Sequence, residues 1–456
     1  MGKKILNFVL FITYNPATIV MLYLHYFIPV FNQLDQVGRA AWLSSVGPDG
    51  YPEMKKLQEV ESIGKAVNLN KKFEFTNSAV SNGKGISKKP LAGFIAVDFT
   101  NVLAGPNCGR MLSELGATVY KVEPHNPQHP PMVMVAWQAE GNAGKKTIIL
   151  DMHTDKGKEV MYDLVKLADV CIFNKSDNQV VSMGLDRETL NKLNPKIIHL
   201  NLQARKGEDK TADSANWPGY DPALQGKTGI SKRFGPPGCP TLHGVASCVD
   251  YCTAYLGAWS GLTALYTREA NGITGESAGA SLALTASIMQ FTHLGDGTDS
   301  NIPVGPKATG PTPFTRVYEL KNIPGKWVYV VADCDLSKDM EADYKSVDEA
   351  IQKLADRGYV AVEVHSTRLI ADRNLEGDSK TVCYENRERN GLHTRTWKPT
   401  WICYDNEPLE HPGAVGPTGC DKEDILENVL GYNTDKTRDL IQGGIVKQDY
   451  WVDCKN

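Results

Sequence analysis

The chain has 456 residues, of which 41% are hydrophobic and 22% are charged, and its formal net charge is -4. This length is enough for a sizeable core and for two domains. The near balance of acidic and basic residues excludes the strongly basic surface of a typical nucleic-acid-binding protein, so no nucleic-acid partner is predicted. The ten cysteines lack paired metal-ligand spacing, so we expect reduced thiols and no metal.

The beginning of the chain is unusually apolar. Residues 5–31 follow a Lys-Lys pair and are almost wholly apolar, which is typical of a signal anchor or a single membrane helix. Asn15 and Pro16 interrupt this segment, so a buried segment or a misplaced translation start is the alternative. We expect an intracellular protein, cytoplasmic or organellar, and leave membrane contact through residues 5–31 open. Residues 1–93 are interpreted as an extension that ends in a polar linker.

After this extension, short apolar runs alternate with amphipathic stretches. The expected strands are 94–99, 116–123, 146–151, 170–174 and 197–202, and the expected helices are 108–115, 154–167 and 186–193. Such alternation builds βαβ units, which pair their strands in parallel. We therefore predict an α/β fold with a doubly wound, Rossmann-like parallel sheet in a large domain over residues 94–300. Ligands bind at the carboxyl ends of such strands, so functional loops should begin near Asn101, Glu123, Asn174 and Leu202.

A second, smaller domain follows a segment rich in proline and glycine. The expected elements are a boundary at 303–313, a strand at 326–333, a helix at 346–357 and a strand at 360–364. This pattern predicts a small α+β domain over residues 301–395. Residues 396–456 are expected to return to the large domain and to contain a helix at 424–431.

Asp250 is the strongest candidate for a reactive group. It follows an apolar approach from Gly244 and precedes a long helical pattern, which places it at a strand-to-helix junction. The unpaired N–H groups and the partial positive charge of a helix start would hold its carboxylate ionised and aimed outward. An ionised and partly desolvated aspartate is a nucleophile toward an activated carbonyl. The alternative is that Asp250 only caps the helix.

Several segments, in order, resemble the family III CoA-transferases, also called the CaiB/BaiF family. The matching segments are Asp98–Glu123, Gly144–Asp151, Ala168–Asn174, Met183–Leu185, Leu193–Ile198 and Pro218–Asp221. The resemblance covers about residues 94–290 and continues more weakly toward the C-terminus. It implies an interlaced homodimer, with coenzyme A bound as a substrate and no metal.

The resemblance also implies a reaction. Asp250 falls where the family carries its nucleophile, which moves CoA from an acyl-CoA thioester to a carboxylic acid through an aspartyl anhydride and an aspartyl-CoA thioester. One alternative is an acyl-CoA racemase or isomerase on the same fold. The racemase pattern has His at the position of Tyr220 and a glycine-rich run in place of Tyr251–Thr253, and both differences count against it. A non-catalytic protein that binds CoA, or a membrane-attached partner protein, is the third hypothesis.

The residues expected to contact CoA form three groups by this resemblance. They are Val102, Leu103 and Ala104 beside the thioester, then Leu150, Asp151, Met152, His153, Asn174 and Lys175 toward the nucleotide, and Gly219, Tyr220 and Asp221 near the nucleophile. Lys145, Lys146 and Lys175 are candidates for phosphate contacts as point charges. Ordinary structural roles are the alternative for every one of these residues.

The chain also departs from the pattern of the family's formyl-CoA transferases. Pro124 and Pro218 stand where those enzymes have basic residues, and Leu103 stands where they have a glutamine. Formate and oxalate are therefore not the expected acids. The apolar Leu103 favours a larger and less polar acyl group.

Overall fold

The computed structural model describes residues 89–127, 141–205, 219–244, 248–290, 304–365, 384–397, 403–404, 407–408 and 412–447. The chain divides into two units, residues 1–74 and 75–456, and all described residues belong to the second. The apolar segment 5–31 and Pro218 lie outside the described residues. Within the described ranges, no helix has the length and apolar character needed to span a membrane.

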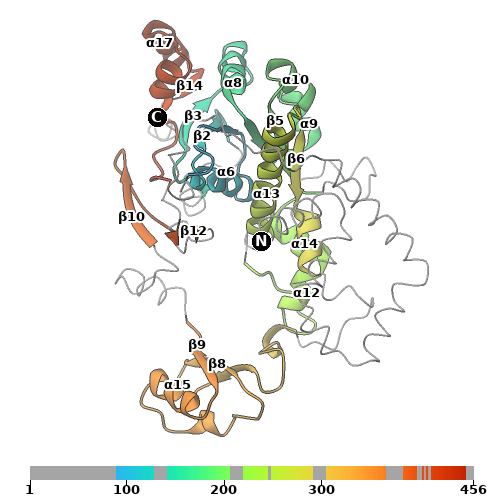
Figure 1. The fold of residues 1–456 in the computed structure, drawn as a ribbon, viewed down its shortest axis with the longest axis vertical. Helices are drawn as coiled ribbons and strands as arrows, with labels where there is room; N and C mark the ends of the chain where they lie inside the picture. Colours follow the sequence, from blue (N-terminus) through green and yellow to red (C-terminus); the bar gives the residue numbers. More distant parts are fainter. Residues whose placement is uncertain are drawn as a thin grey trace, which may run out of the picture. The chain divides into compact units, whose positions relative to one another are not determined.

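A seven-stranded sheet is the centre of the fold (Figure 1), with the order β14-β3-β2-β1-β4-β5-β6. Its strands are β1 (Ile95–Asp98), β2 (Thr118–Pro124), β3 (Lys146–Leu150), β4 (Val170–Phe173), β5 (Ile198–Gln203), β6 (Ser277–Ser281) and β14 (Val446–Lys447). All neighbours pair in parallel except β14, which pairs antiparallel with β3. The order from β3 to β6 is that of doubly wound nucleotide-binding folds, so the predicted parallel α/β sheet is confirmed.

Some of the described helices cover the two faces of this sheet, and others pack together in a separate small core. They are α6 (Ala104–Glu114), α8 (Asp155–Leu167), α9 (Asp177–Ser182), α10 (Arg187–Leu193), α11 (Asp221–Thr228), α12 (Ile230–Phe234), α13 (Cys248–Asn271), α14 (Leu282–Met289), a π-helical turn η6 (Asp424–Val429) and α17 (Thr434–Gln442). Helix α6 begins earlier than the expected Cys108. Pro106 is tolerated in its first turn because the N–H groups there have no intrahelical partner.

The alternation of side chains along each strand divides the core into two layers. Val97, Val122 and Ile148 pack with α8, α10 and α17 on one face, whereas Ala96 and Val119 pack with α6 and α13 on the other. Since successive strand residues point to opposite faces, Asp98, Lys121 and Glu123 also belong to the face that α6 covers. All three charged side chains are buried there.

The remaining described elements form smaller units. They are η4 (Gly305–Lys307), β7 (Arg316–Glu319), β8 (Trp327–Val331), η5 (Asp339–Glu341), α15 (Val347–Asp356), β9 (Val360–Glu363), β10 (Tyr384–Arg389), β11 (Leu392–Trp397), β12 (Cys403–Tyr404) and β13 (Glu407–Pro408). Strands β7, β8 and β9 pair antiparallel and share a core with α15. Strands β10 and β11 form a hairpin closed by Asn390 and Gly391, whose φ angles of 51° and 80° match a two-residue turn of the Asn-Gly type.

Candidate active site

Helix α13 places its first turn at the carboxyl edge of the sheet. A methyl group on Gly257 would lie 2.8 Å from the Leu202 side chain, and one on Gly261 would lie 2.9 Å from Leu200. Further along, Arg268 donates to the Lys196 carbonyl at 3.0 Å. The helix therefore runs antiparallel to β5, and Asp250 lies about two turns, or roughly 10 Å, before Gly257 along the helix axis. That direction leads past the carboxyl end of β5, where the functional loops are expected.

Asp250 lies within the first turn of α13 and is only 6% exposed. Among the residues that the structure describes, its carboxylate accepts no hydrogen bond. The described residues 241–244 contain no strand, and residues 245–247 lie outside the described ones, so the expected strand-to-helix junction stays a prediction. Val249, part of the apolar approach, belongs to the helix and packs into a core with Leu224.

Asp221, from the start of α11, caps the helix that carries Asp250. Its Oδ2 atom accepts the backbone N–H groups of Val249 at 2.9 Å and of Asp250 at 3.0 Å. Gln225 donates to the Asp221 carboxylate, and the backbone N–H of His243 donates to Gln225 Oε1 at 2.7 Å. The capping function is therefore supplied by a residue distant in sequence, and Asp250 does not supply it.

This arrangement changes the electrostatics expected for Asp250. Burial, and then the negative charge of Asp221, raise the pKa of the Asp250 carboxyl to about 7. The prediction that the helix start holds this carboxylate ionised is wrong in direction. The main physical reason is that burial removes the water that would stabilise the carboxylate. In addition, two N–H groups of the first turn already bind the Asp221 carboxylate, whose charge opposes ionisation of its neighbour.

The loops that follow β1 and β4 meet at the point where the strand order reverses. Asn174 Oδ1 accepts the backbone N–H of Asn101 at 3.0 Å, and Asn174 Nδ2 donates to the Asn101 carbonyl at 2.6 Å. The next residue, Val102, has a φ of +66°, which is strained for a β-branched residue. Leu103 is fully buried, so its side chain faces the interior and gives no support to a role in choosing the acyl group.

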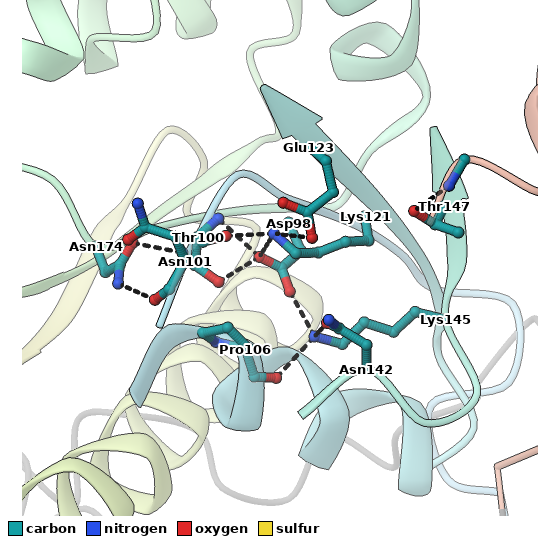
Figure 2. A network of polar contacts seen from close by, with 11 residues as sticks. Asp98, Thr100, Asn101, Pro106, Lys121, Glu123, Asn142, Lys145, Thr147 and Asn174 are labelled. Carbon is teal, nitrogen blue, oxygen red and sulfur yellow. Dashed lines mark hydrogen bonds and ion pairs between the residues drawn. The ribbon is translucent and has the colours of Figure 1, made fainter. Parts of the chain in front are cut away.

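A buried cluster of four charges lies beneath the β1 loop (Figure 2), formed by Asp98, Lys121, Glu123 and Lys145. Lys145 Nζ donates to Asp98 Oδ2 at 2.6 Å and to the Pro106 carbonyl at 2.7 Å. Lys121 Nζ lies 3.6 Å from Asp98 and 3.6 Å from Glu123. The prediction that Lys145 meets a phosphate is wrong, because its ammonium group is fully buried in this cluster.

Burial and the neighbouring charges act in opposite directions on this four-charge cluster. Burial alone would raise the pKa of Asp98, but Lys121 and Lys145 outweigh it and hold that pKa below its usual value. Burial lowers the pKa of Lys145 to about 8, even though Asp98 opposes the shift. The pKa of Glu123 is raised, mainly by burial. Asp98 is therefore the ionised partner of both lysines.

A small pocket of about 80 Å³ lies at the carboxyl ends of β2 and β3. Its lining combines the expected residues Leu150, Asp151, Met152 and His153 with Pro124, His125 and Asn126. The fold thus brings one of the predicted groups together around a single hollow. The sequence alone assigned no role to His125, because a lone histidine without a known partner carries no signal of its own; the structure places it in the lining of this pocket.

The other expected residues are distributed around this edge. Tyr220 precedes α11 and is 44% exposed. Burial and the charge of Lys121 lower the pKa of Lys175. Lys146 pairs with Asp424 at 2.7 Å. Among the described residues, no group of His, Cys, Asp and Glu side chains is arranged to hold a metal ion.

The amino-acid sequence was compared with protein families and with known proteins. Residues 91–357, more than half of the chain, match CoA-transferase family III. The chain is 36% identical over 176 residues to the succinate–glutarate CoA-transferase of Agrobacterium fabrum, covering 35% of this chain and 43% of that protein. It is 30% identical over 191 residues to a formyl-CoA:oxalate CoA-transferase of Escherichia coli, covering 40% of this chain and 45% of that protein. These matches span less than half the length of each relative.

Solved structures of the same family have a similar fold. A CaiB/BaiF family protein from Brucella suis aligns with a TM-score of 0.62 at 21% identity, over 75% of this chain and all of that one. At this identity the likeness concerns the fold alone. The sequence match, which covers most of the large sheet and the whole of α13, carries the assignment, and the chain therefore belongs to CoA-transferase family III.

Proposed function

We propose that this chain is a CoA-transferase in which Asp250 is the nucleophile. An Asp250 oxygen attacks the thioester carbonyl of an acyl-CoA, the C–S bond breaks, and an acyl-aspartyl anhydride forms as CoA thiolate leaves. The thiolate then attacks the aspartyl carbonyl and releases the first acid as a carboxylate. A second carboxylate attacks the aspartyl-CoA thioester, and the thiolate finally attacks the new acyl group. Asp250 is regenerated, and the acyl group stays activated throughout, alternately as a thioester and as an anhydride with free CoA thiolate.

The environment of Asp250 is the observation that carries this proposal. A carboxylate that is 6% exposed and accepts no hydrogen bond from the described residues keeps its lone pairs available for attack. Desolvation that raises its pKa to about 7 also makes the ionised form more basic and hence more nucleophilic. A residue with only a structural role would gain from hydrogen bonds that satisfy its charge.

The expected CoA contacts fit the carboxyl edge of the sheet. The β1 loop with Val102, Leu103 and Ala104 would contact the thioester end through its backbone, since the Leu103 and Ala104 side chains are buried. The pocket at Leu150–His153 would contact part of the nucleotide, because its volume is smaller than that of a whole ligand site. Lys175, Gly219 and Tyr220 complete the proposed surface, whereas Asp221 is buried and acts as the cap of α13.

We also assign a homodimer to this function, as the family resemblance implies. Helix α13 presents Tyr255, Leu256, Trp259 and Tyr266 at helical spacing, each more than a third exposed. An aromatic stripe of this kind on one helix is typical of the core of a protein interface. A second copy of the chain would cover it.

Trapping the covalent intermediate tests the nucleophile. The full chain is incubated with succinyl-CoA, acetyl-CoA or formyl-CoA, quenched with hydroxylamine and digested for mass spectrometry. The expected product is a hydroxamate on Asp250, with CoA exchange to added glutarate, succinate or oxalate. Asp250→Ala should abolish both while leaving CoA binding intact. Asp348→Asn is the matched control, because Asp348 is an exposed acid in the first turn of α15.

Other outcomes point to the other hypotheses. Turnover retained in Asp250→Ala would remove the nucleophile assignment. Deuterium incorporation at the α-carbon of an acyl-CoA, without an acid acceptor, would instead support a racemase or isomerase. Binding of acyl-CoA with no exchange to any acid would support a non-catalytic protein.

A further inference from the structure

The loop between β1 and α6 is held by side chains from three other segments of the sheet. Thr100 donates through its backbone N–H and its hydroxyl to Asp98 Oδ1, at 2.9 and 2.5 Å. Lys121, from β2, donates to the Thr100 carbonyl. Lys145, directly before β3, joins Asp98 to the Pro106 carbonyl in the first turn of α6. Asn174, after β4, clamps both backbone groups of Asn101. Figure 2 shows these contacts converging on the loop.

The loop needs such anchors because local sequence does not stabilise it. Helix α6 has no side-chain cap at Leu103, and Val102 occupies the left-handed region at +66°. For a β-branched residue this conformation is strained, and it persists only where surrounding contacts fix it. The packing is also tight, since a methyl group on Gly109 would lie 2.6 Å from Asp98 Oδ2.

Burying four charges is an expensive way to gain stability alone. Replacing a buried ion pair with apolar residues of similar volume is often neutral for folding. A buried pair fixes geometry more strictly than apolar packing, because its hydrogen bonds are directional. The Asp98–Lys145 pair is aimed at the two ends of the β1 loop, Thr100 and Pro106, which indicates where that geometry matters.

We propose that Asp98 and Lys145 are positioning residues that hold the backbone of Val102–Ala104 against the thioester end of acyl-CoA. The inference rests on the proposed function, and it adds a role for residues that touch no substrate. The pair acts on the β1 loop and not on the pocket at Leu150–His153, which is lined by other residues. Loss of the pair should therefore weaken recognition of the acyl-pantetheine arm while sparing the nucleotide.

The test variant removes one charge of each sign. Asp98→Asn with Lys145→Met leaves Lys121 and Glu123 as a neutral pair, so no uncompensated charge is buried. Either single change would leave an excess charge and destabilise the fold. Thr100→Val is a second variant without any change of charge, because it removes the hydroxyl donor to Asp98 and keeps the shape of the side chain.

The matched control is an ion pair at the opposite edge of the same sheet. Arg268 and Asp169 are joined at 2.7 Å, and Arg268 is 7% exposed. Asp169 directly precedes β4, near the amino ends of the strands. Arg268→Met with Asp169→Asn should lower the melting temperature but leave loop protection, ligand affinity and turnover unchanged.

Three measurements on the full chain decide the proposal. Hydrogen exchange of the peptide covering residues 99–106 should become about tenfold faster or more in the Asp98/Lys145 double variant, and faster to a lesser degree in Thr100→Val. Turnover in CoA exchange should fall about a hundredfold, as expected for a misplaced substrate-positioning backbone. Affinity for acetyl-CoA should fall by about tenfold, while affinity for 3′-phosphoadenosine 5′-diphosphate changes less than about twofold.

Specific results would overturn it. Unchanged hydrogen exchange at residues 99–106 in the double variant would show that the Asp98–Lys145 pair does not hold the loop. Faster hydrogen exchange combined with wild-type turnover and wild-type acetyl-CoA affinity would show that holding the loop has no consequence for the reaction. An equal loss of affinity for the nucleotide would indicate general damage to the protein. If the wild-type chain exchanges CoA with no acid, the proposed function fails. The loop-exchange and affinity measurements then still decide the positioning inference.

Discussion

The Asp221 carboxylate accepts the backbone N–H of Asp250 at 3.0 Å and raises the pKa of the Asp250 carboxyl by its charge. One group therefore fixes the position of the other and makes its ionisation costly. The first effect stabilises the start of α13, and the second stores unfavourable electrostatic energy at the proposed nucleophile. Such opposition between stability and reactivity is expected at an active site.

The pH dependence of turnover should follow the ionisation of Asp250. Because the attacking form is the carboxylate and its pKa is about 7, kcat/KM for CoA exchange should rise with pH and level off above about pH 7. Asp221→Asn keeps an oxygen acceptor for the backbone N–H groups but removes the repelling charge. The midpoint should therefore move to lower pH in that variant. Burial, the larger cause of the raised pKa, remains in that variant, so only part of the shift should be lost. A pH profile with no change in midpoint would contradict a contribution from the Asp221 charge.

Removing the charge of Asp250 should stabilise the protein at high pH. Its pKa is raised from 3.8 to about 7 in the folded state, so the native protein binds more protons than the unfolded chain between these values. Stability contributed by this group is therefore lost as pH rises through about 7, by up to about 4 kcal/mol. Urea unfolding at about pH 5.5 and about pH 8.5 should show Asp250→Asn gaining stability over wild type, more so at the higher pH. An equal gain of Asp250→Asn over wild type at both pH values would refute the raised pKa of Asp250.

At Val102, a glycine substitution should destabilise the protein less than an alanine substitution, which is the reverse of the usual order. With a φ of +66°, an alanine keeps the strain of a Cβ atom in the left-handed region, whereas a glycine does not. Both variants lose the same methyl groups of valine. We expect Val102→Gly to be more stable than Val102→Ala by about 1 kcal/mol, measured by thermal unfolding. At Ala355, near the end of α15 and with no positive φ, glycine should instead be the less stable residue.

A charge on the exposed stripe of α13 should separate the proposed dimer. Trp259 is 48% exposed in the single chain, and an aspartate there would bury a charge in an apolar interface. Sedimentation velocity of Trp259→Asp should show a smaller species than wild type. Val181→Asp is the control, since Val181 is an exposed apolar residue on another helix. A wild-type chain that sediments as a stable monomer would rule out the dimer.

Much of the large sheet could be read from the order of residues. The apolar runs of β1 and β4 are buried on both sides, and such runs are distinctive. Strand β5 alternates apolar and polar residues over Ile198–Gln203, which is a second strand signal. Strand β6 was missed because Ser277–Ser281 contains only serine, alanine and glycine. It is a strand because β5 supplies a partner along its whole length.

For the candidate site, too, some features could be predicted from the sequence and others could not. Local sequence singled out Asp250 and placed the loops at Asn101 and Asn174 at one edge, because parallel strands must end together. It could not predict that Asp221 caps α13 or that Lys145 reaches Asp98, since these contacts join residues 28 and 47 positions apart.

By itself the sequence determined the order of the strands and helices and which side chains are candidates for the chemistry, because residue type and period are properties of the chain. The protonation of Asp250, the burial of Lys145 and the strain at Val102 were decided only by the tertiary structure. Each of these depends on desolvation and on charges brought close by folding, and neither quantity exists until distant segments pack together.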